Sequence, residues 1–179
     1  MASPESKTLQ TLVGEFKLNE DLSDDFTQVL GFVGVNMLIQ KASGAASVYL
    51  KIQQPSHDEI KMEQTAMSAA VPGLKEDYKL DWQWRAGHDP FFGDVETRCR
   101  WLTQEEAKEI GADGQWSKDD SEGKLIQAMG KPPHGGWTAT HWWGFEAVSG
   151  ARRHTRYVEV VGRDGKEIKV RMVYDFEGE

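Results

Sequence analysis

The sequence predicts an all-β fold: a closed antiparallel up-and-down barrel of about nine to ten strands, with a two-helix lid after the first strand. Three observations predict it. One segment of alternating hydrophobic residues precedes a single stretch with helical spacing, and the later hydrophobic segments alternate with a period of two. The connections are short, which favours a meander over crossover units. Closure into a barrel then removes the exposed edges that a long meander would leave.

The first strand is expected over residues 12–18, where hydrophobic side chains occupy every second position. The spacing then becomes helical. Ser23 is expected to cap the first of two short helices within residues 23–42, and Gly44 ends the second. A strand followed by two helices therefore opens the fold.

The remaining chain is expected to consist of strands in one domain that spans residues 1–179. A tenth, short strand is expected at Gln115–Trp116, and hairpin turns at Pro55–Asp58 and Gly162–Gly165. The eight further strands are expected at residues 48–53, 59–66, 77–85, 94–103, 123–129, 137–146, 153–161 and 167–176.

The composition and charge of the chain restrict the partners and the cellular location that can be expected. The formal net charge of −8 argues against a nucleic-acid partner, which needs a clustered basic face. The longest apolar stretch, residues 29–39, has about half the length that a spanning helix needs, so no membrane span is expected. The single cysteine, Cys99, suits a reducing compartment, and the N-terminal residues lack a secretory pattern. The expected location is the cytoplasm, and the oligomeric state stays open.

The first 45 residues carry a resemblance to a known family. The segment Gly14–Leu18, then Asp24–Phe26 and a helical pair that ends near Lys41, resembles the start of the intracellular fatty-acid-binding proteins, which belong to the calycins. The chain is also similar to fungal lipocalin-like proteins, some of which are cofactor-independent pericyclases. The resemblance implies a barrel whose interior binds a hydrophobic small molecule.

Seven tryptophans are a high number for 179 residues. Aromatic side chains on the inner face of a barrel would line a pocket for a flat or polyunsaturated ligand, while the plainer alternative is core packing. The expected ligand-binding residues are Tyr78, Trp82, Trp84, Trp101, Trp137, Trp143 and Phe145.

Three polar residues are candidates for catalysis: His141, Arg156 and Tyr157. His141 lies in the densest aromatic segment and could donate a hydrogen bond or act as a general acid or base near neutral pH. Strand parity places Arg156 and Tyr157 on opposite faces, so only one of them can line a cavity. An inward arginine would bind a carboxylate or enolate, and an inward tyrosine would donate a hydrogen bond. The Arg-x-Tyr motif with which fatty-acid-binding proteins hold a carboxylate is not reproduced.

Two functions therefore stay open. The chain could bind a hydrophobic small molecule, a lipid or a natural-product intermediate, as a carrier. Alternatively, as the resemblance implies, it could be a cofactor-independent pericyclase or cyclase for a polyketide- or terpenoid-type intermediate in fungal secondary metabolism. No zinc, nucleotide, flavin or haem motif is present, so no metal or cofactor is expected. A purely structural or protein-binding role would require a filled interior and a large exposed apolar patch.

Overall fold

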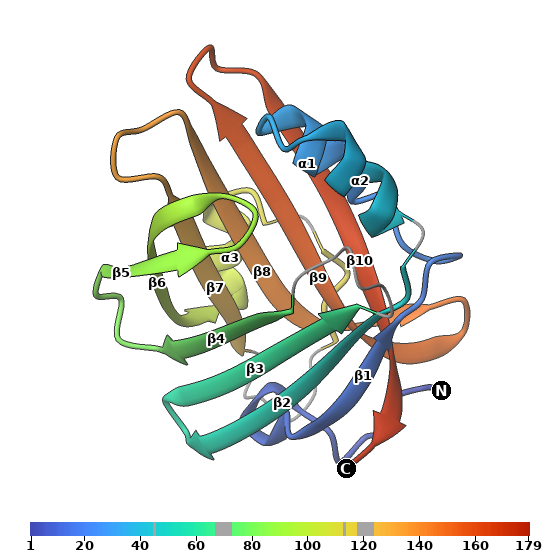
Figure 1. The fold of residues 1–179 in the computed structure, drawn as a ribbon. Helices are drawn as coiled ribbons and strands as arrows, with labels where there is room; N and C mark the ends of the chain where they lie inside the picture. Colours follow the sequence, from blue (N-terminus) through green and yellow to red (C-terminus); the bar gives the residue numbers. More distant parts are fainter. Residues whose placement is uncertain (45, 67–72, 113, 118–123) are drawn as a thin grey trace.

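An antiparallel sheet of ten strands curls into a barrel in the computed structural model, which describes residues 1–44, 46–66, 73–112, 114–117 and 124–179 (Figure 1). The strands are β1 (Gly14–Leu18), β2 (Val48–Ser56), β3 (Glu59–Ala66), β4 (Leu74–Lys79), β5 (Arg85–Asp89), β6 (Gly93–Thr103), β7 (Lys124–Lys131), β8 (Trp137–Val148), β9 (Ala151–Gly162) and β10 (Glu167–Gly178). Each strand pairs with its neighbour in sequence except β4 with β5, and β1 also pairs with β10. The predicted barrel is confirmed.

The barrel stays open between β4 and β5, which do not pair with each other. The predicted single strand over residues 77–85 is wrong, because the chain leaves β4 and crosses to β6 before β5 begins. Trp82 has a φ of +61°, which is uncommon for a bulky residue, and its amide donates to the Cys99 carbonyl of β6 at 2.8 Å. This turn interrupts the alternation that the sequence suggests.

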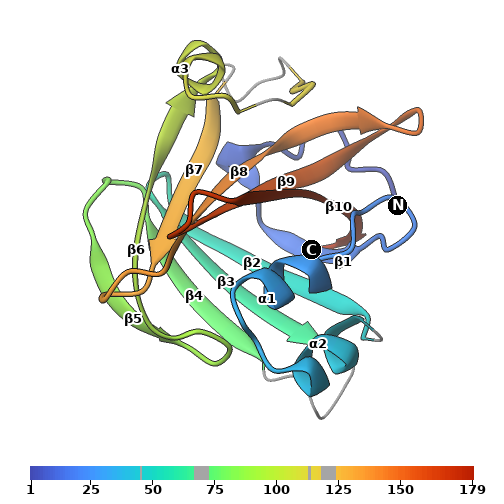
Figure 2. The same ribbon diagram turned by 90° about the horizontal axis from the view of Figure 1, so that it is seen from above.

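Two short helices, α1 (Thr27–Phe32) and α2 (Met37–Gly44), lie side by side at one end of the barrel, next to β10 (Figures 1 and 2). The predicted lid is confirmed. Val29 and Leu30 of α1 are buried, whereas none of the eight residues of α2, all of them described, is buried. The lid is therefore held mainly through α1. No helix in the described ranges is long and apolar enough to cross a membrane.

The expected cap of the first helix is wrong. The Ser23 hydroxyl accepts a hydrogen bond from the Val173 amide of β10 at 2.8 Å and so ties the chain to the sheet. The Asp25 carboxylate accepts from the amide of Thr27 at 2.9 Å instead. A serine beside an unpaired strand segment satisfies that backbone donor rather than a helical one.

A third helix, α3 (Gln104–Glu109), lies on the outside of the barrel beyond β6 and β7 (Figure 2). Together with Ala112 and Trp116 it covers a second, smaller cluster on the outer face of β6–β8. The tenth strand expected at Gln115–Trp116 is reduced to a single bridge between Trp116 and Glu146. The tenth strand of the barrel is β5, which shares only Arg85 with the predicted strand over residues 77–85 and otherwise follows it.

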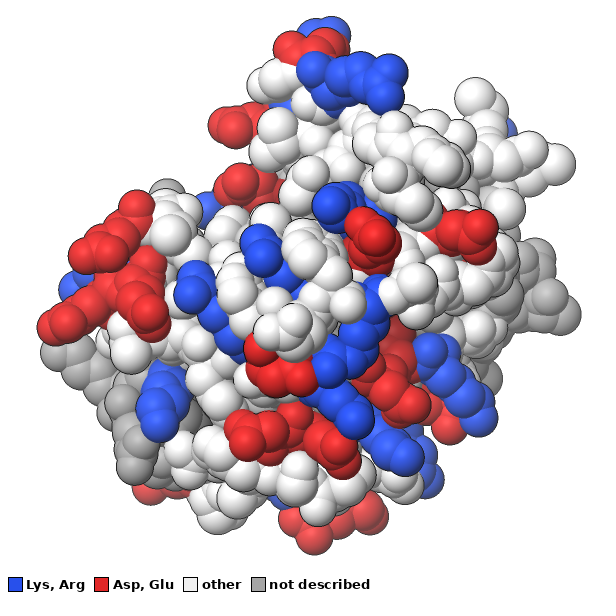
Figure 3. Space-filling view, turned by 90° about the vertical axis from the view of Figure 1, so that its left-hand side faces the viewer, with Lys and Arg blue, Asp and Glu red and all other residues white. Residues whose placement is uncertain are grey.

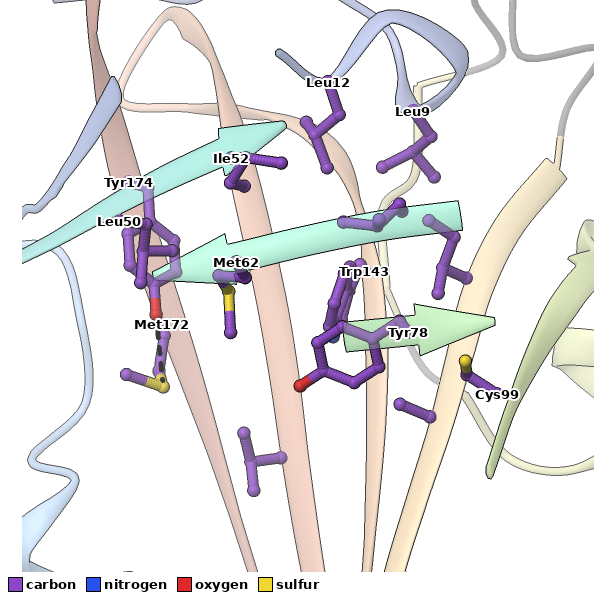
Figure 4. Close-up of a cluster of buried hydrophobic side chains, with 14 of the residues drawn as sticks. Leu9, Leu12, Leu50, Ile52, Met62, Tyr78, Cys99, Trp143, Met172 and Tyr174 are labelled. Carbon is purple, nitrogen blue, oxygen red and sulfur yellow. Dashed lines mark hydrogen bonds between the residues drawn. The ribbon is translucent and has the colours of Figure 1, made fainter. Parts of the chain in front are cut away.

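The end of the barrel opposite the lid is filled by the protein's own side chains (Figure 4). A 3-10 helix, η1 (Leu9–Thr11), packs there, and Leu12 and Phe16 are fully buried. Trp143 is also fully buried and meets Tyr78 edge to face, with ring centroids 4.9 Å apart. We call this half the closed end and the half beneath α1 the lid end.

Candidate functional site

A cavity of about 350 Å³ occupies the lid end of the barrel. Its volume lies within the range of small-molecule sites. Apolar side chains from α1 and the residue before it, from the turn between β5 and β6 and from the strands form much of its wall, including Phe26, Val29, Phe92, Val158, Val160 and Met172. The cavity is therefore suited to the apolar body of a ligand.

The cavity exists because the inward side chains beyond the closed end include small ones. Along β8 the inward series runs from Phe145 and Trp143 at the closed end through His141 to Ala139, and Trp137 at the start of the strand lines the cavity wall. Gly130 of β7 lies opposite Ala139. A barrel of this width fills itself only where its inward side chains are large, so small residues leave space.

Arg156 of β9 lies where the cavity meets the closed end and is only 4% exposed. Its guanidinium carbon lies 4.0 Å from the ring centroid of Trp143, a cation–π contact. Its Nη1 donates to the thioether sulfur of Met62 at 3.0 Å, and its Nη2 is buried without a hydrogen-bond partner. Within the described part of the chain, no carboxylate forms an ion pair with Arg156. A buried cation with an unused donor and a weak sulfur acceptor is poised to bind an oxyanion.

His154 holds the other side of this guanidinium. Its Nδ1 donates to the Gly144 carbonyl at 3.0 Å, because that oxygen can only accept. Its Nε2 therefore accepts from Nε of Arg156 at 3.1 Å. Burial, together with the Arg156 charge, lowers the pKa of His154 well below its ordinary range, so the imidazole is neutral at pH 7. This arrangement fixes the plane in which Arg156 presents its remaining donors.

His141 joins Arg156 in the cavity wall, from the neighbouring strand. Burial and then the positive charge of Arg156 lower the pKa of His141 to about 4. The imidazole is thus neutral at pH 7 and can donate or accept a hydrogen bond.

Glu76 and Asp89 also line the cavity, and sequence reasoning missed both. Burial raises the pKa of Glu76, although a hydrogen bond with Tyr78 and the charge of Arg156 oppose the rise. Burial likewise raises the pKa of Asp89. Glu76 shares the inward parity of Tyr78, so an extension of the predicted strand toward the N-terminus would have found it.

Four of the predicted site residues meet in the cavity wall: Tyr78, Trp137, His141 and Arg156. Trp143 and Phe145 face inward too, but at 0% and 3% exposure they fill the closed end and do not line the cavity. Trp143 supports the site indirectly, because it lies against Arg156. The core-packing alternative therefore describes these two aromatic residues.

Two other predicted tryptophans lie on the outer face of the barrel. The Arg98 guanidinium packs over Trp82 and Trp84, 3.9 and 4.4 Å from their ring centroids. Trp84 is 37% exposed. The strand break at Trp82 turns these side chains away from the interior. On the side of the barrel seen in Figure 3, basic and acidic side chains are intermixed, and one group of acidic side chains gathers at the left of the view.

Tyr157 and Trp101 do not join the cavity either. Tyr157 points outward from β9, where its hydroxyl donates to Glu146 at 3.2 Å. Trp101 stacks on His57 near the turn between β2 and β3, with ring centroids 5.0 Å apart. The choice that parity left open between Arg156 and Tyr157 is thus decided in favour of Arg156 as the inward residue.

Comparisons with known proteins give relatives at low sequence identity. No protein-family model matches the chain. The chain is 26% identical to the probable pericyclase scpY of Mollisia scopiformis over an alignment of 181 positions, gaps included, that covers 99% of this chain and 95% of the relative. It is 27% identical to the pericyclase pydY of Acremonium sp. over an alignment of 194 positions, gaps included, that covers 99% of this chain and 98% of the relative.

Solved structures confirm the fold. The chain aligns with the REP1-NXSQ fatty acid transporter at a TM-score of 0.61 and 14% identity, over 94% of this chain and 97% of that one. It aligns with the fluorescent protein UnaG at a TM-score of 0.62 and 15% identity, over 94% and 99%. The chain therefore has a fatty-acid-binding-protein-like calycin fold and has fungal pericyclases among its relatives, as the resemblance predicts.

Proposed function

We propose that this chain binds a hydrophobic small molecule with an anionic or strongly polar oxygen head inside the barrel cavity. The observation that carries the proposal is Arg156, a buried guanidinium with an unpartnered Nη2 at the base of an apolar cavity. Burial of the ligand's apolar body supplies the driving force, and Arg156 fixes the orientation of its head.

The ligand enters with its polar head toward the closed end. Arg156 lies deepest among the lining residues of β9, and Val158 and Val160 follow toward the lid. Met62 is a flexible side chain with a weak acceptor, so a ligand oxygen displaces its sulfur from Nη1 at little cost. The body of the ligand then lies under α1.

A fluorescence titration tests this proposal with cis-parinaric acid, a conjugated polyene carboxylate, and its methyl ester. The wild type should bind the acid roughly 10- to 100-fold more tightly than the ester, because a charge-assisted hydrogen bond contributes about 1.5–3 kcal/mol. Arg156→Gln should lose this preference and keep its affinity for the ester. The matched control is Arg163→Gln, in the exposed turn after β9.

Binding of neither probe to the wild type would contradict the cavity as a ligand site. An unchanged preference for the acid in Arg156→Gln would contradict the role of the guanidinium. Circular dichroism of each variant shows whether the barrel is intact.

We propose cofactor-independent pericyclic catalysis as a second candidate function, supported by the two fungal pericyclases that match 99% of the chain. A pericyclic reaction needs a reactive conformer to be held, and a shaped cavity can supply this. A hydrogen bond from Arg156 or His141 to a conjugated carbonyl would stabilise charge that develops in the transition state.

Native mass spectrometry of the protein from its own source, followed by incubation with the metabolite that it carries, separates the two candidates. A pericyclic isomerisation leaves the mass unchanged, so the product must be followed by chromatographic retention and ultraviolet absorbance. Release of the metabolite unchanged supports the carrier. Conversion faster than in buffer, and slower with Arg156→Gln, supports the enzyme.

We also propose a cytoplasmic location. Cys99 is a buried free thiol on β6, and burial raises its pKa to about 12. A reducing compartment suits a protein that keeps a free thiol. Fractionation of the source cells tests this, and recovery only from the secreted fraction would contradict it.

A further inference from the structure

We propose that Glu76 shares the polar head of the ligand with Arg156, as a carboxylic acid that donates a hydrogen bond to one oxygen of a delocalised oxyanion. The second oxygen of that oxyanion accepts from the Arg156 guanidinium. This inference rests on the proposed binding function and narrows the ligand class to apolar molecules whose acidic head spreads one negative charge over two oxygens.

The two side chains reach the same level of one cavity from different walls, Glu76 from β4 and Arg156 from β9. Met62 of β3 shows that Glu76 and Arg156 lie at the same height in the barrel. It pairs with Glu76 across β3 and β4, and its sulfur lies 3.0 Å from Nη1 of Arg156. Among the described residues, Glu76 and Arg156 form no direct ion pair, so a third group can bridge them.

The surroundings of Glu76 favour its neutral form. Burial is the largest influence on its pKa and raises it, and the nearby carboxyl group of Asp89 adds to the rise. The hydrogen bond with Tyr78 and the charge of Arg156 act the other way and do not reverse it. The titratable groups of the described residues that share this cavity with Glu76 lie on several elements. They are Glu20, Asp24 and Asp25 between β1 and α1, Tyr78 on β4, Asp89 on β5, His141 on β8, Arg156 on β9 and Tyr174 on β10.

Tyr78 sets the direction of the hydrogen bonds. Burial and then the adjacent Glu76 raise the pKa of Tyr78 well above its ordinary value, so its hydroxyl keeps its proton and is a hydrogen-bond donor beside Glu76. A carboxyl group that accepts from this hydroxyl through one oxygen has its protonated oxygen left to donate to a ligand. An ionised Glu76 would instead repel an anionic head, because like charges at one site disfavour each other.

This arrangement predicts a proton-linked affinity. A titration of cis-parinaric acid from pH 5.5 upward, over the range in which the barrel stays folded, should show the wild type losing roughly tenfold or more in affinity as Glu76 ionises, while the methyl ester binds equally across the range. Glu76→Gln keeps an N–H donor and carries no charge. It should bind the acid at every pH within about threefold of the wild type at pH 5.5.

Two further variants sharpen the assignment. Asp77→Asn is the matched control, because Asp77 is the exposed neighbour on the same strand. Asp89→Asn removes a second carboxyl group of the cavity wall, the one whose charge raises the pKa of Glu76, and should leave most of the pH dependence in place. Binding of the methyl ester reports an intact cavity in each variant.

The outcomes separate this inference from the proposed function. If the wild type binds neither acid nor ester, the proposed function fails. If both bind but Glu76→Gln keeps the wild-type pH dependence, or binds the acid at least about tenfold more weakly at every pH, the role of Glu76 as a proton donor is overturned.

Discussion

The two ends of the barrel use the same strands for opposite purposes. At the closed end, Phe16, Trp143 and Phe145 are nearly or fully buried against one another. At the lid end, Ala139 and Gly130 occupy the corresponding inward positions, and the space in front of them stays open. The comparison teaches that inward orientation does not make a residue part of the site, because the size of its neighbours decides whether it packs or lines a cavity.

The polar groups lie where the two ends meet. His154 belongs to the closed end and is fully buried, and its hydrogen bond orients Arg156 toward the cavity level. The packed half of the barrel therefore acts as a rigid support for Arg156, the one arginine or lysine among the described residues that line the cavity. A site supported in this way is organised before the ligand arrives.

The largest expected difference between the two ends of the barrel is in the free energy of unfolding that is lost when a tryptophan is removed. Trp143→Ala at the closed end should lower the free energy of unfolding by about 3–5 kcal/mol, since it removes a large, fully buried side chain. Trp137→Ala at the lid end, where the indole is partly exposed, should cost less than half as much. Urea unfolding of both variants measures the difference, and equal losses would contradict the division into a packed and a hollow half.

Filling the hollow half should affect binding more than folding. Ala139→Phe places a ring in open space, so its stability should change by less than about 1 kcal/mol, whereas overpacking a filled core typically costs about 1–3 kcal/mol. Its affinity for cis-parinaric acid should fall at least about tenfold, because the ring occupies ligand space. Ala147→Phe, on an exposed position of the same strand, is the control and should bind normally. Normal binding by Ala139→Phe would place the ligand elsewhere.

The smallest expected effect is a pH dependence of stability from His141. Its folded pKa of about 4 lies below the ordinary value of 6.5, so the unfolded chain binds more protons between these values. Its contribution to stability is thus complete above about pH 6.5 and is lost as pH falls toward 4. The raised pKa of Glu76 acts in the opposite direction over part of this range, so the informative quantity is a difference between proteins.

Urea unfolding at pH 5 and pH 7.5 measures that difference. His141→Gln should lose less stability than the wild type on going to pH 5, and the exposed His134→Gln should behave as the wild type does. Identical losses in His141→Gln and the wild type would show that His141 is not held neutral in the cavity.

The order of elements could be predicted from sequence because alternation and helical spacing are local signals. The break at Trp82 could not, since a positive φ at a tryptophan leaves no mark on the hydrophobic pattern. The helix α3 does leave a mark in the sequence. Thr103 and Glu106 form a capping box, a pattern that precedes helices, and the prediction from hydrophobic spacing did not include it.

The site was predicted in part. Parity narrowed the choice to Arg156 or Tyr157, but the inward face of β9 depends on its pairing with β8, which one strand's sequence does not reveal. Glu76 was missed because β4 begins earlier than expected. The position of the cavity was readable in principle, from the decrease in side-chain size between Phe145 and Ala139, once the strands are aligned.

A crystal structure with bound cis-parinaric acid tests the central claim most directly. The account predicts the carboxylate within hydrogen-bonding distance of Arg156, with the sulfur of Met62 displaced and the polyene running past Val158 and Val160 toward α1. A carboxylate at the lid, or a probe bound on the outer face beside Trp84, would contradict it.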